Sequence, residues 1–88
     1  MEIEFDPEKA TSNLRKHRVS FAHAEQALRD PLGITIEGPD SEGDPRFVTL
    51  GADSLGRILV VVHTPRDDRV RIISAPKASQ NEVRNYHA

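Results

Sequence analysis

Residues 57–64 of the chain read Arg-Ile-Leu-Val-Val-Val-His-Thr, and every position from Ile58 to Val62 is apolar. A β-branched run without polar positions predicts a strand that is covered on both faces. We therefore expect this segment at the centre of a sheet. The run is far too short to cross a lipid bilayer.

Strand-like segments flank this run on both sides. Residues 46–52 and 69–74 are rich in β-branched side chains, and turn-forming sequences at 53–56 and 65–68 separate them from the central segment. This spacing predicts a meander of antiparallel hairpins.

Two further strands are expected nearer the N-terminus. Ile3 and Phe5 alternate with acidic residues, which predicts a short strand near residues 2–5. Residues 32–37 have the composition of a strand, and the acidic, turn-rich segment 38–45 that follows predicts a loop.

Three helices have recognisable start signals. Asp6–Pro7 offers a capping carboxylate followed by proline, so the first helix should run to about His17. The residues expected on its inward face are Ala10, Leu14 and His17. Ser20 should cap a second helix that ends before Asp30–Pro31. The residues expected on the inward face of this helix are Phe21, Ala24 and Leu28.

The third helix should begin after Ser79, which has capping-box spacing to Glu82, and should place Val83 and Tyr86 on the core. The predicted order is β-α-α-β-β-β-β-α. Because 88 residues leave room for one hydrophobic core, we expect a single α+β domain over residues 1–88. Its mostly antiparallel sheet should be packed by helices in two layers.

The composition excludes several classes of protein. The chain has no cysteine, which excludes disulfide scaffolds, thiolate nucleophiles and Cys-type zinc sites. The first residues are acidic rather than basic and then apolar, so we expect no signal peptide and a cytoplasmic location. We also expect no contact with a membrane.

Charge is unevenly distributed along the chain. Residues 1–45 carry a net charge of −5 and residues 46–88 one of +3, within a total of −2. A phosphate-rich partner would therefore meet the second half, since each phosphate contact needs a local cation. Arginines that guard strand edges would give the same distribution.

Several blocks of sequence together carry a resemblance to a known family. The longest are residues 5–9 (Phe-Asp-Pro-Glu-Lys), 13–21 (Asn-Leu-Arg-Lys-His-Arg-Val-Ser-Phe), 56–64 and 71–75. The shorter ones are Asp30–Pro31, Arg46–Phe47, Lys77–Ala78, Glu82 and Tyr86. In this order, and along nearly the whole chain, they resemble BrnT-type toxins of bacterial type II toxin–antitoxin systems.

The resemblance implies a RelE-like fold and an endoribonuclease that cleaves RNA without a metal or other cofactor and inhibits translation. It also implies a BrnA-type antitoxin that binds the toxin in a hetero-oligomer and neutralises it. Operator DNA would be contacted only indirectly, through the antitoxin.

Two positions depart from the pattern of the family. Arg18 stands where these toxins usually have glycine, at the end of the first helix. Pro76 replaces an arginine in the family's Ser-Ala-Arg-Lys-Ala sequence. The loss of that guanidinium favours an alternative function, in which the chain is a catalytically weak or inactive module that acts through its antitoxin complex.

Metal-free RNA cleavage requires groups that take a proton, stabilise charge on the phosphate and protonate the leaving oxygen. Arginine suits the phosphate, and histidine suits proton transfer near neutral pH. The residues that we select as catalytic are Arg46, His63, Lys77 and Arg84. His63 could equally be a structural residue beside Thr64, and the three cations could be solvated surface charges.

Four more residues are candidates for binding RNA: Lys16, His17, Arg71 and Tyr86. Each has a structural alternative. His17 could complete the inward stripe of the first helix while Lys16 lies at the helix end. Arg71 could be an edge charge, and Tyr86 could pack on the sheet instead of stacking on a base.

Two other kinds of site are disfavoured. The four histidines are scattered without ligand spacing, which predicts no metal site. Direct DNA binding lacks support, because no helix-turn-helix glycine turn or helix with clustered cations is present.

Overall fold

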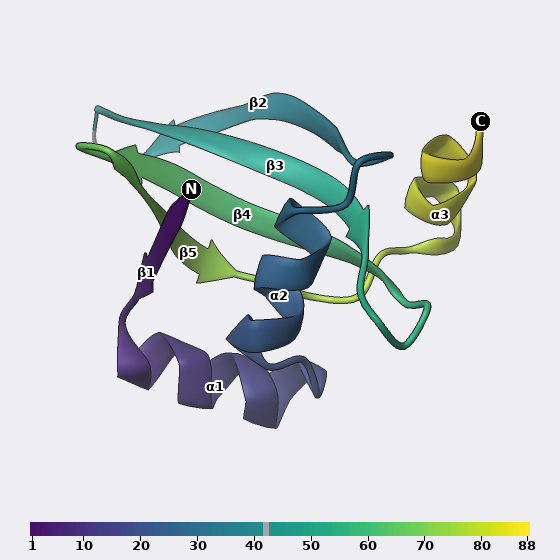
Figure 1. Cartoon of the computed structure of the whole chain (residues 1–88), viewed down its shortest axis with the longest axis horizontal. Helices are drawn as coiled ribbons and strands as arrows, with labels where there is room; N and C mark the ends of the chain where they lie inside the picture. Colours follow the sequence, from purple (N-terminus) through teal and green to yellow (C-terminus); the bar gives the residue numbers. More distant parts are fainter. Residues whose placement is uncertain (42) are drawn as a thin grey trace.

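The computed structural model describes residues 1–41 and 43–88, which form three helices and one five-stranded sheet (Figure 1). The elements in chain order are β1 (Glu2–Phe5), α1 (Pro7–His17), α2 (Phe21–Leu28), β2 (Ile34–Ser41), β3 (Asp44–Ala52), β4 (Ile58–Arg66), β5 (Arg69–Ser74) and α3 (Gln80–His87). The predicted order and the α+β class are confirmed.

The sheet has the strand order β1-β5-β4-β3-β2. β1 pairs in parallel with β5, and the other three pairings are antiparallel hairpins. β4 therefore lies at the centre, as its apolar run predicts. β1, the first strand of the chain, closes one edge beside the last strand.

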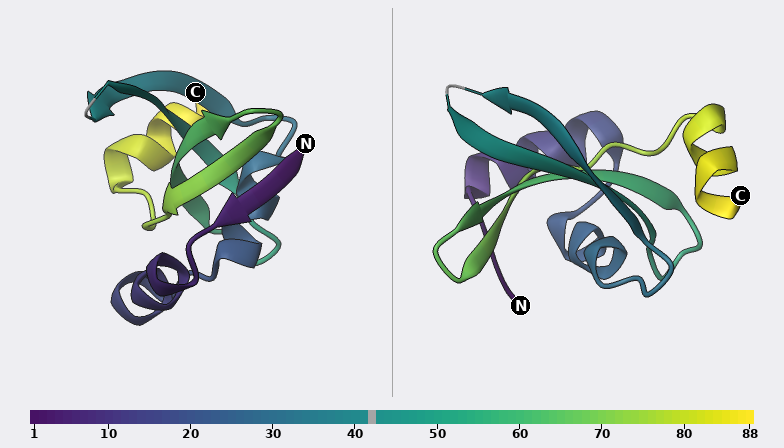
Figure 2. Two further views of the ribbon diagram at one scale, coloured as in Figure 1. Left: turned by 90° about the vertical axis from the view of Figure 1, so that its left-hand side faces the viewer. Right: turned by 90° about the horizontal axis from the view of Figure 1, so that it is seen from above.

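The two faces of the sheet are covered to different extents. α1 and α2 lie against one face, the covered face, whereas α3 stands apart at the far end of the molecule (Figures 1 and 2). The core lies under α2, where buried Val19, Phe21, Ala24 and Ala27 meet Leu59, Val61, Ile72 and Ala75. On the opposite, open face Val60 and Val62 are only half-buried. The expectation that both faces of β4 are fully covered is therefore wrong for the open face.

α2 packs very closely on β3 because of a glycine. A Cβ atom at Gly51 would overlap the carbonyl oxygen of Ala27 in α2. The absence of a side chain thus lets the helix backbone rest on the strand, and this contact sets the distance between the two layers.

The helix termini follow the sequence signals. Asp6 accepts a hydrogen bond from the backbone N–H of Glu8 (2.9 Å), and Pro7 occupies the first turn. Ser20 caps α2, and Ser79 and Glu82 form the predicted capping box. α1 ends at Arg18, whose φ of 60° is left-handed and whose N–H donates to the carbonyl oxygen of Leu14. Arginine thus occupies a conformation that favours glycine.

The predicted inward stripe of α1 is wrong at Leu14, which is 50% exposed. The adjacent Asn13 is buried instead, at 4% exposure. Its amide donates to the carbonyl oxygens of Val19 (2.9 Å) and Ala75 (3.1 Å) and accepts from the N–H of Ala75 (2.9 Å). α1 faces irregular backbone here, and an amide can satisfy backbone groups that leucine would leave unpaired.

Segment 38–45 is largely strand rather than the predicted loop. β2 extends to Ser41 and β3 begins at Asp44, with Gly38 paired to Arg46 and an irregularity before Ser41. Position 42 of that segment lies outside the described residues. Hairpin pairing with β3 overrides the local turn composition.

Two smaller predictions also need correction. β2 begins at Ile34 rather than at residue 32, because the N–H groups of Leu32 and Gly33 bond back to Asp30 in a turn. Val83 and Tyr86 are half-buried and do not join the core, since α3 lies away from α1 and α2.

We expect Asn13→Asp to destabilise the fold by about 2–3 kcal/mol, because two buried carbonyl oxygens lose their donor and face a carboxylate. Urea unfolding followed by circular dichroism measures this loss. Asn81→Asp, on an exposed position of α3, is the matched control and should change stability by less than about 0.5 kcal/mol. Equal urea midpoints for the two variants would contradict the view that the hydrogen bonds of Asn13 stabilise the packing of α1 on the segment around Ala75.

Candidate functional site

A pocket of about 230 Å³ lies between α1 and the end of β5. The residues that line it are Lys9, Ser12, Asn13, Lys16, His17, Ile73 and Ser74. The α1 residues recur at helical spacing and therefore share one face of the helix. In β5, the pairs Val62–Ser74 and His63–Ile72 leave Ile73 as an extra residue. This bulge shapes the sheet side of the pocket.

The pocket is positively charged. Lys9 and Lys16 contribute ammonium groups, His17 contributes an imidazole, and Ser12 and Ser74 contribute hydroxyls. No acidic side chain of the described residues lines it. This combination of cations and hydroxyl donors suits an anionic ligand such as a phosphate group.

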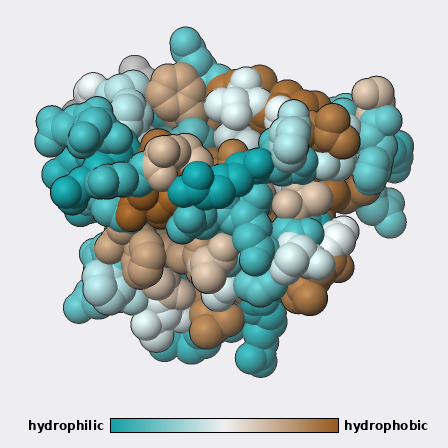
Figure 3. Space-filling view, in the orientation of Figure 1, coloured by the Kyte–Doolittle hydropathy of each residue, from teal (hydrophilic) through white to brown (hydrophobic). Residues whose placement is uncertain are grey.

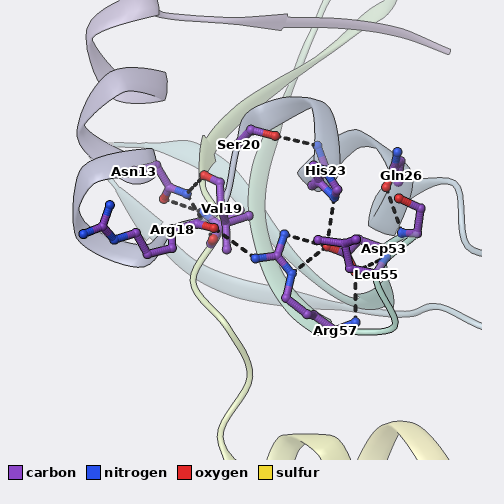
Figure 4. A network of polar contacts seen from close by, with 11 residues as sticks. Asn13, Arg18, Val19, Ser20, His23, Gln26, Asp53, Leu55 and Arg57 are labelled. Atoms are coloured by element: carbon purple, nitrogen blue, oxygen red, sulfur yellow. Dashed lines mark hydrogen bonds and ion pairs between the residues drawn. The ribbon is translucent and has the colours of Figure 1, made fainter.

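Buried polar contacts fix the α1 wall of the pocket. Asn13 ties α1 to Ala75, the residue after Ser74, through two hydrogen bonds. Beyond His17, the carbonyl oxygen of Arg18 accepts from Nη1 of Arg57 (2.9 Å), which also binds Asp53 (Figure 4). The C-terminal turn of α1 is therefore held from two directions.

Asp53 anchors that second contact. Its buried carboxylate binds Nη2 of Arg57 (2.7 Å) and Nδ1 of His23 (3.0 Å). Burial raises the pKa of Asp53, but the hydrogen bonds from Arg57 and His23 outweigh it, so the pKa lies below its ordinary value. Asp53 is consequently ionised at neutral pH and keeps Arg57 in place.

The structure thus brings Lys16 and His17 together in one pocket and adds three polar residues that sequence reasoning missed: Lys9 and Ser12 on α1, and Ser74 at the end of β5. For the two residues of α1 the missed signal was helical spacing. Lys9, Ser12 and Lys16 lie three, four and seven residues apart, which places them on one face of a helix whose start was correctly identified.

Lys77 lies next to the pocket without lining it. Segment 76–78 continues along β4, with the N–H of Val60 donating to the carbonyl oxygen of Pro76 (2.9 Å) and Lys77 bridged opposite Leu59. Alternation places Ser74 and Pro76 toward one side of this segment and Lys77 toward the other. Lys77 is exposed.

Arg46 and Arg71 share the open face of the sheet. Each is adjacent to a residue of the covered face, Phe47 or Ile72, and successive side chains alternate between faces. They lie on β3 and β5, so about 10 Å separates their backbones. Arg71 forms an ion pair with Glu4 (3.3 Å), while Nε of Arg46 is buried without a hydrogen-bond partner among the described residues.

His63 lies on the covered face, away from both arginines. It is paired with Phe47 and Ile72 in the sheet, its ring stacks on Phe47 with centroids 6.1 Å apart, and its Nε2 lies 2.9 Å from the hydroxyl of Thr49. Burial lowers the pKa of His63. The structure therefore does not bring His63 together with Arg46 or Lys77.

The remaining two candidates are on α3. Arg84 is exposed. The hydroxyl of Tyr86 donates to Asp30, which also accepts from the backbone N–H groups of Leu32 (2.9 Å) and Ala52 (2.8 Å). Tyr86 therefore fastens α3 to the end of β3, and its hydroxyl is engaged within the chain.

Neither a metal-binding cluster nor a helix that could span a membrane is present in the described part of the structure. Residues 1–41 and 43–88 contain no group of three or more histidine or acidic side chains arranged to hold a metal ion. None of the three helices in these residues is long and apolar enough to span a membrane.

Comparison with known proteins identifies the family to which the chain belongs. Residues 5–82 match the family model described as the ribonuclease toxin, BrnT, of type II toxin–antitoxin systems. The chain belongs to the BrnT toxin family. Its fold is similar to the crystal structure of the Brucella abortus ribonuclease toxin BrnT, with 28% sequence identity and a TM-score of 0.65 over 91% of this chain and 99% of that one. No curated protein matches the chain.

The extent of the BrnT match bears on the candidate residues. It includes every residue that lines the pocket and also Arg46, His63, Arg71 and Lys77. It ends before Arg84 and Tyr86. The part of the chain that is shared with BrnT toxins thus contains the whole pocket but only the first turn of α3.

We expect Tyr86→Phe to cost about 1 kcal/mol at neutral pH, because Asp30 loses a donor. The Tyr86 hydroxyl is the main cause that lowers the pKa of Asp30, so this stabilisation is present above the ordinary carboxyl pKa and is lost as the pH falls through the lowered one. Between about pH 7 and about pH 3 the variant should therefore lose less stability than the unmodified chain. Thermal unfolding across this range measures the difference.

The control is a double-mutant cycle with Asp30→Asn. In that background Tyr86→Phe should have much less effect on stability, because the carboxylate acceptor is already gone. Additive effects of the two substitutions would contradict a direct Tyr86–Asp30 contact.

Proposed function

We propose that this chain is the endoribonuclease of a type II toxin–antitoxin pair, that it cleaves RNA without a metal ion, and that it thereby inhibits translation in the cytoplasm. A BrnA-type antitoxin would neutralise it in a hetero-oligomer and contact operator DNA. One observation carries the proposal: the cationic pocket between α1 and β5, which lies within the region shared with BrnT toxins.

The nucleophile in this reaction is the 2′-hydroxyl of the RNA itself. It attacks the adjacent phosphorus, the 5′-oxygen of the next nucleotide leaves, and a 2′,3′-cyclic phosphate and a 5′-hydroxyl result. The protein needs to bind the phosphate, stabilise its added negative charge and transfer protons. All three tasks can be met by side chains.

The pocket residues match these tasks. Lys9 and Lys16 would bind the scissile phosphate and stabilise its charge, aided by the hydroxyls of Ser12 and Ser74. His17 would transfer a proton, because histidine changes protonation near neutral pH. Lys77 points to the other side of its segment from Ser74, so we give it no part in binding the phosphate in the pocket.

The arginines on the open face extend the site. Arg71 is three residues before Ser74 on β5, a distance of about 10 Å along the strand, and Arg46 lies on the same face two strands away. RNA that enters the pocket would thus pass over these two guanidinium groups. We assign Arg46 to RNA binding rather than to the chemistry, because it does not line the pocket. His63 and Arg84 receive no part in the chemistry.

A second candidate function is a non-catalytic module that binds its antitoxin. The observation that favours it is Pro76, which is next in line after Ser74 on the same side of the segment and carries no charge where BrnT-type toxins usually have arginine. In this view the pocket binds RNA but provides too little charge stabilisation to cleave it.

We expect the purified chain to cleave single-stranded RNA in the presence of a chelator and to leave an oligonucleotide with a 2′-deoxy group at the cut site intact. Lys16→Ala should lower the cleavage rate by about 100-fold, since a cation at the scissile phosphate is removed. Arg46→Ala should weaken RNA binding but change the rate with saturating RNA by less than about threefold. Gel assays with end-labelled RNA measure both.

The matched control is Arg29→Gln, which removes a cation from the end of α2, where Arg29 forms an ion pair with Glu25. Its cleavage rate and its growth arrest in cells should equal those of the unmodified chain. If the unmodified chain binds RNA without cutting it, with and without ribosomes, the non-catalytic module is the correct reading.

Replacement of Pro76 by arginine tests the effect of the missing guanidinium. The Pro76 carbonyl keeps its bond from Val60 in the variant, and an arginine side chain would project on the side of Ser74. We expect Pro76→Arg to raise the cleavage rate by about 10-fold, because one more cation faces the phosphate. Pro76→Gln, a long side chain without charge, is the control and should not raise the rate.

A further inference from the structure

β2 is an edge strand with an unusually apolar side. It pairs only with β3, so the backbone groups along its other edge have no strand partner. Ile34 and Ile36 alternate onto the open face of the sheet and are 40% and 62% exposed. Exposed aliphatic side chains on an edge strand favour the addition of another strand.

The two isoleucines form one wall of a groove. Val48 and Leu50 of β3 and Glu82 and Asn85 of α3 also line it, and its volume is about 190 Å³. Apolar side chains gather along the upper side of the molecule, over β2 and toward α3 (Figure 3). The groove therefore lies beside a free strand edge and offers aliphatic contacts there.

The opposite edge of the sheet is protected. β1 has only four residues, and ion pairs from Glu2 to Arg69 (3.2 Å) and from Glu4 to Arg71 (3.3 Å) lie along it. Charged side chains on an edge discourage strand addition. On β2 the guards of this kind, Pro39 and the register irregularity after Gly38, lie toward the hairpin end, so the stretch from Ile34 to Glu37 is the part of this edge that is open to pairing.

We propose that the free edge of β2 is the surface to which the antitoxin docks, through an extended segment that adds to the sheet as a sixth strand; this inference rests on the proposed function. Alternate side chains of that segment are aliphatic and enter the groove beside Ile34 and Ile36. Strand addition combines backbone hydrogen bonds with side-chain selection at every second position.

Charge indicates the chemistry of the partner. Residues 31–45, which include β2, contain four acidic residues and no basic one. The docking segment therefore carries lysine or arginine near the hairpin end of β2. A second copy of this chain fits less well, since it would bring the same acidic stretch to the interface.

The test uses the protein encoded in the neighbouring reading frame, purified separately and added to the full chain. Hydrogen exchange followed by NMR should show protection of β2 amides in the complex and no change in β1. Ile36→Lys places a charge on the edge strand, which discourages strand addition, and should raise the Kd of the complex by at least about tenfold. Leu55→Lys places the same charge on a residue that is 67% exposed in the β3–β4 turn, and it should change the Kd by less than about twofold.

Each outcome supports or overturns the proposal. Protection elsewhere on the toxin, an unchanged Kd for Ile36→Lys, or an absence of binding would overturn it. A dimer of the chain alone that Ile36→Lys converts to monomer would also overturn it, because β2 then serves self-association. Ile36 lies outside the pocket, so Ile36→Lys should still cleave RNA. Loss of binding with cleavage retained separates this inference from the proposed function.

Discussion

The buried amide of Asn13 holds together the two parts of the chain on which the pocket depends. One wall is a helix formed near the N-terminus, and the other is the end of the last strand, 62 residues later. The amide bonds to both backbone groups of Ala75 and to the carbonyl oxygen of Val19. In a low-dielectric environment each of these groups would be costly without a partner, so Asn13, together with the bond from Arg57 to Arg18, holds the lysines of α1 beside Ser74.

Strand alternation explains why the cations of the second half do not form one site. Neighbouring residues of a strand point to opposite faces, so His63 and Thr64, or Arg71 and Ile72, are separated by the full thickness of the sheet. Arg46 and Arg71 consequently lie on the open face, whereas Lys77 points to the other side of its segment and Arg84 is on α3. In the described part of the chain, the cationic pocket is built instead on α1 residues of the first half, Lys9, Lys16 and His17. The BrnT match includes this pocket in full, whereas it excludes the end of α3.

The order of elements, the central position of β4 and the helix caps followed from sequence, because they depend on local signals such as Asp6–Pro7 and the run from Ile58 to Val62. The RelE-like label remains a prediction. Lys16 and His17 were identified as site residues, but their partners were not. Their position in one pocket with Ser74 depends on a parallel pairing between β1 and β5 and on a bulge at Ile73, neither of which leaves a local pattern. Likewise, nothing in the sequence near Leu14 shows that this turn of α1 packs through Asn13 against backbone groups rather than through Leu14 against apolar side chains.

The parallel pairing of β1 with β5 also constrains the order in which the fold can form during synthesis. β1 and α1 are synthesised before β5. Arg71, the ion-pair partner of Glu4, follows it by 67 residues, and Ser74 also lies far beyond Lys16 in the sequence. Contacts this distant in sequence form late in folding. Until β5 has been made, the chain therefore lacks both the strand that pairs with β1 and the Ser74 side of the pocket.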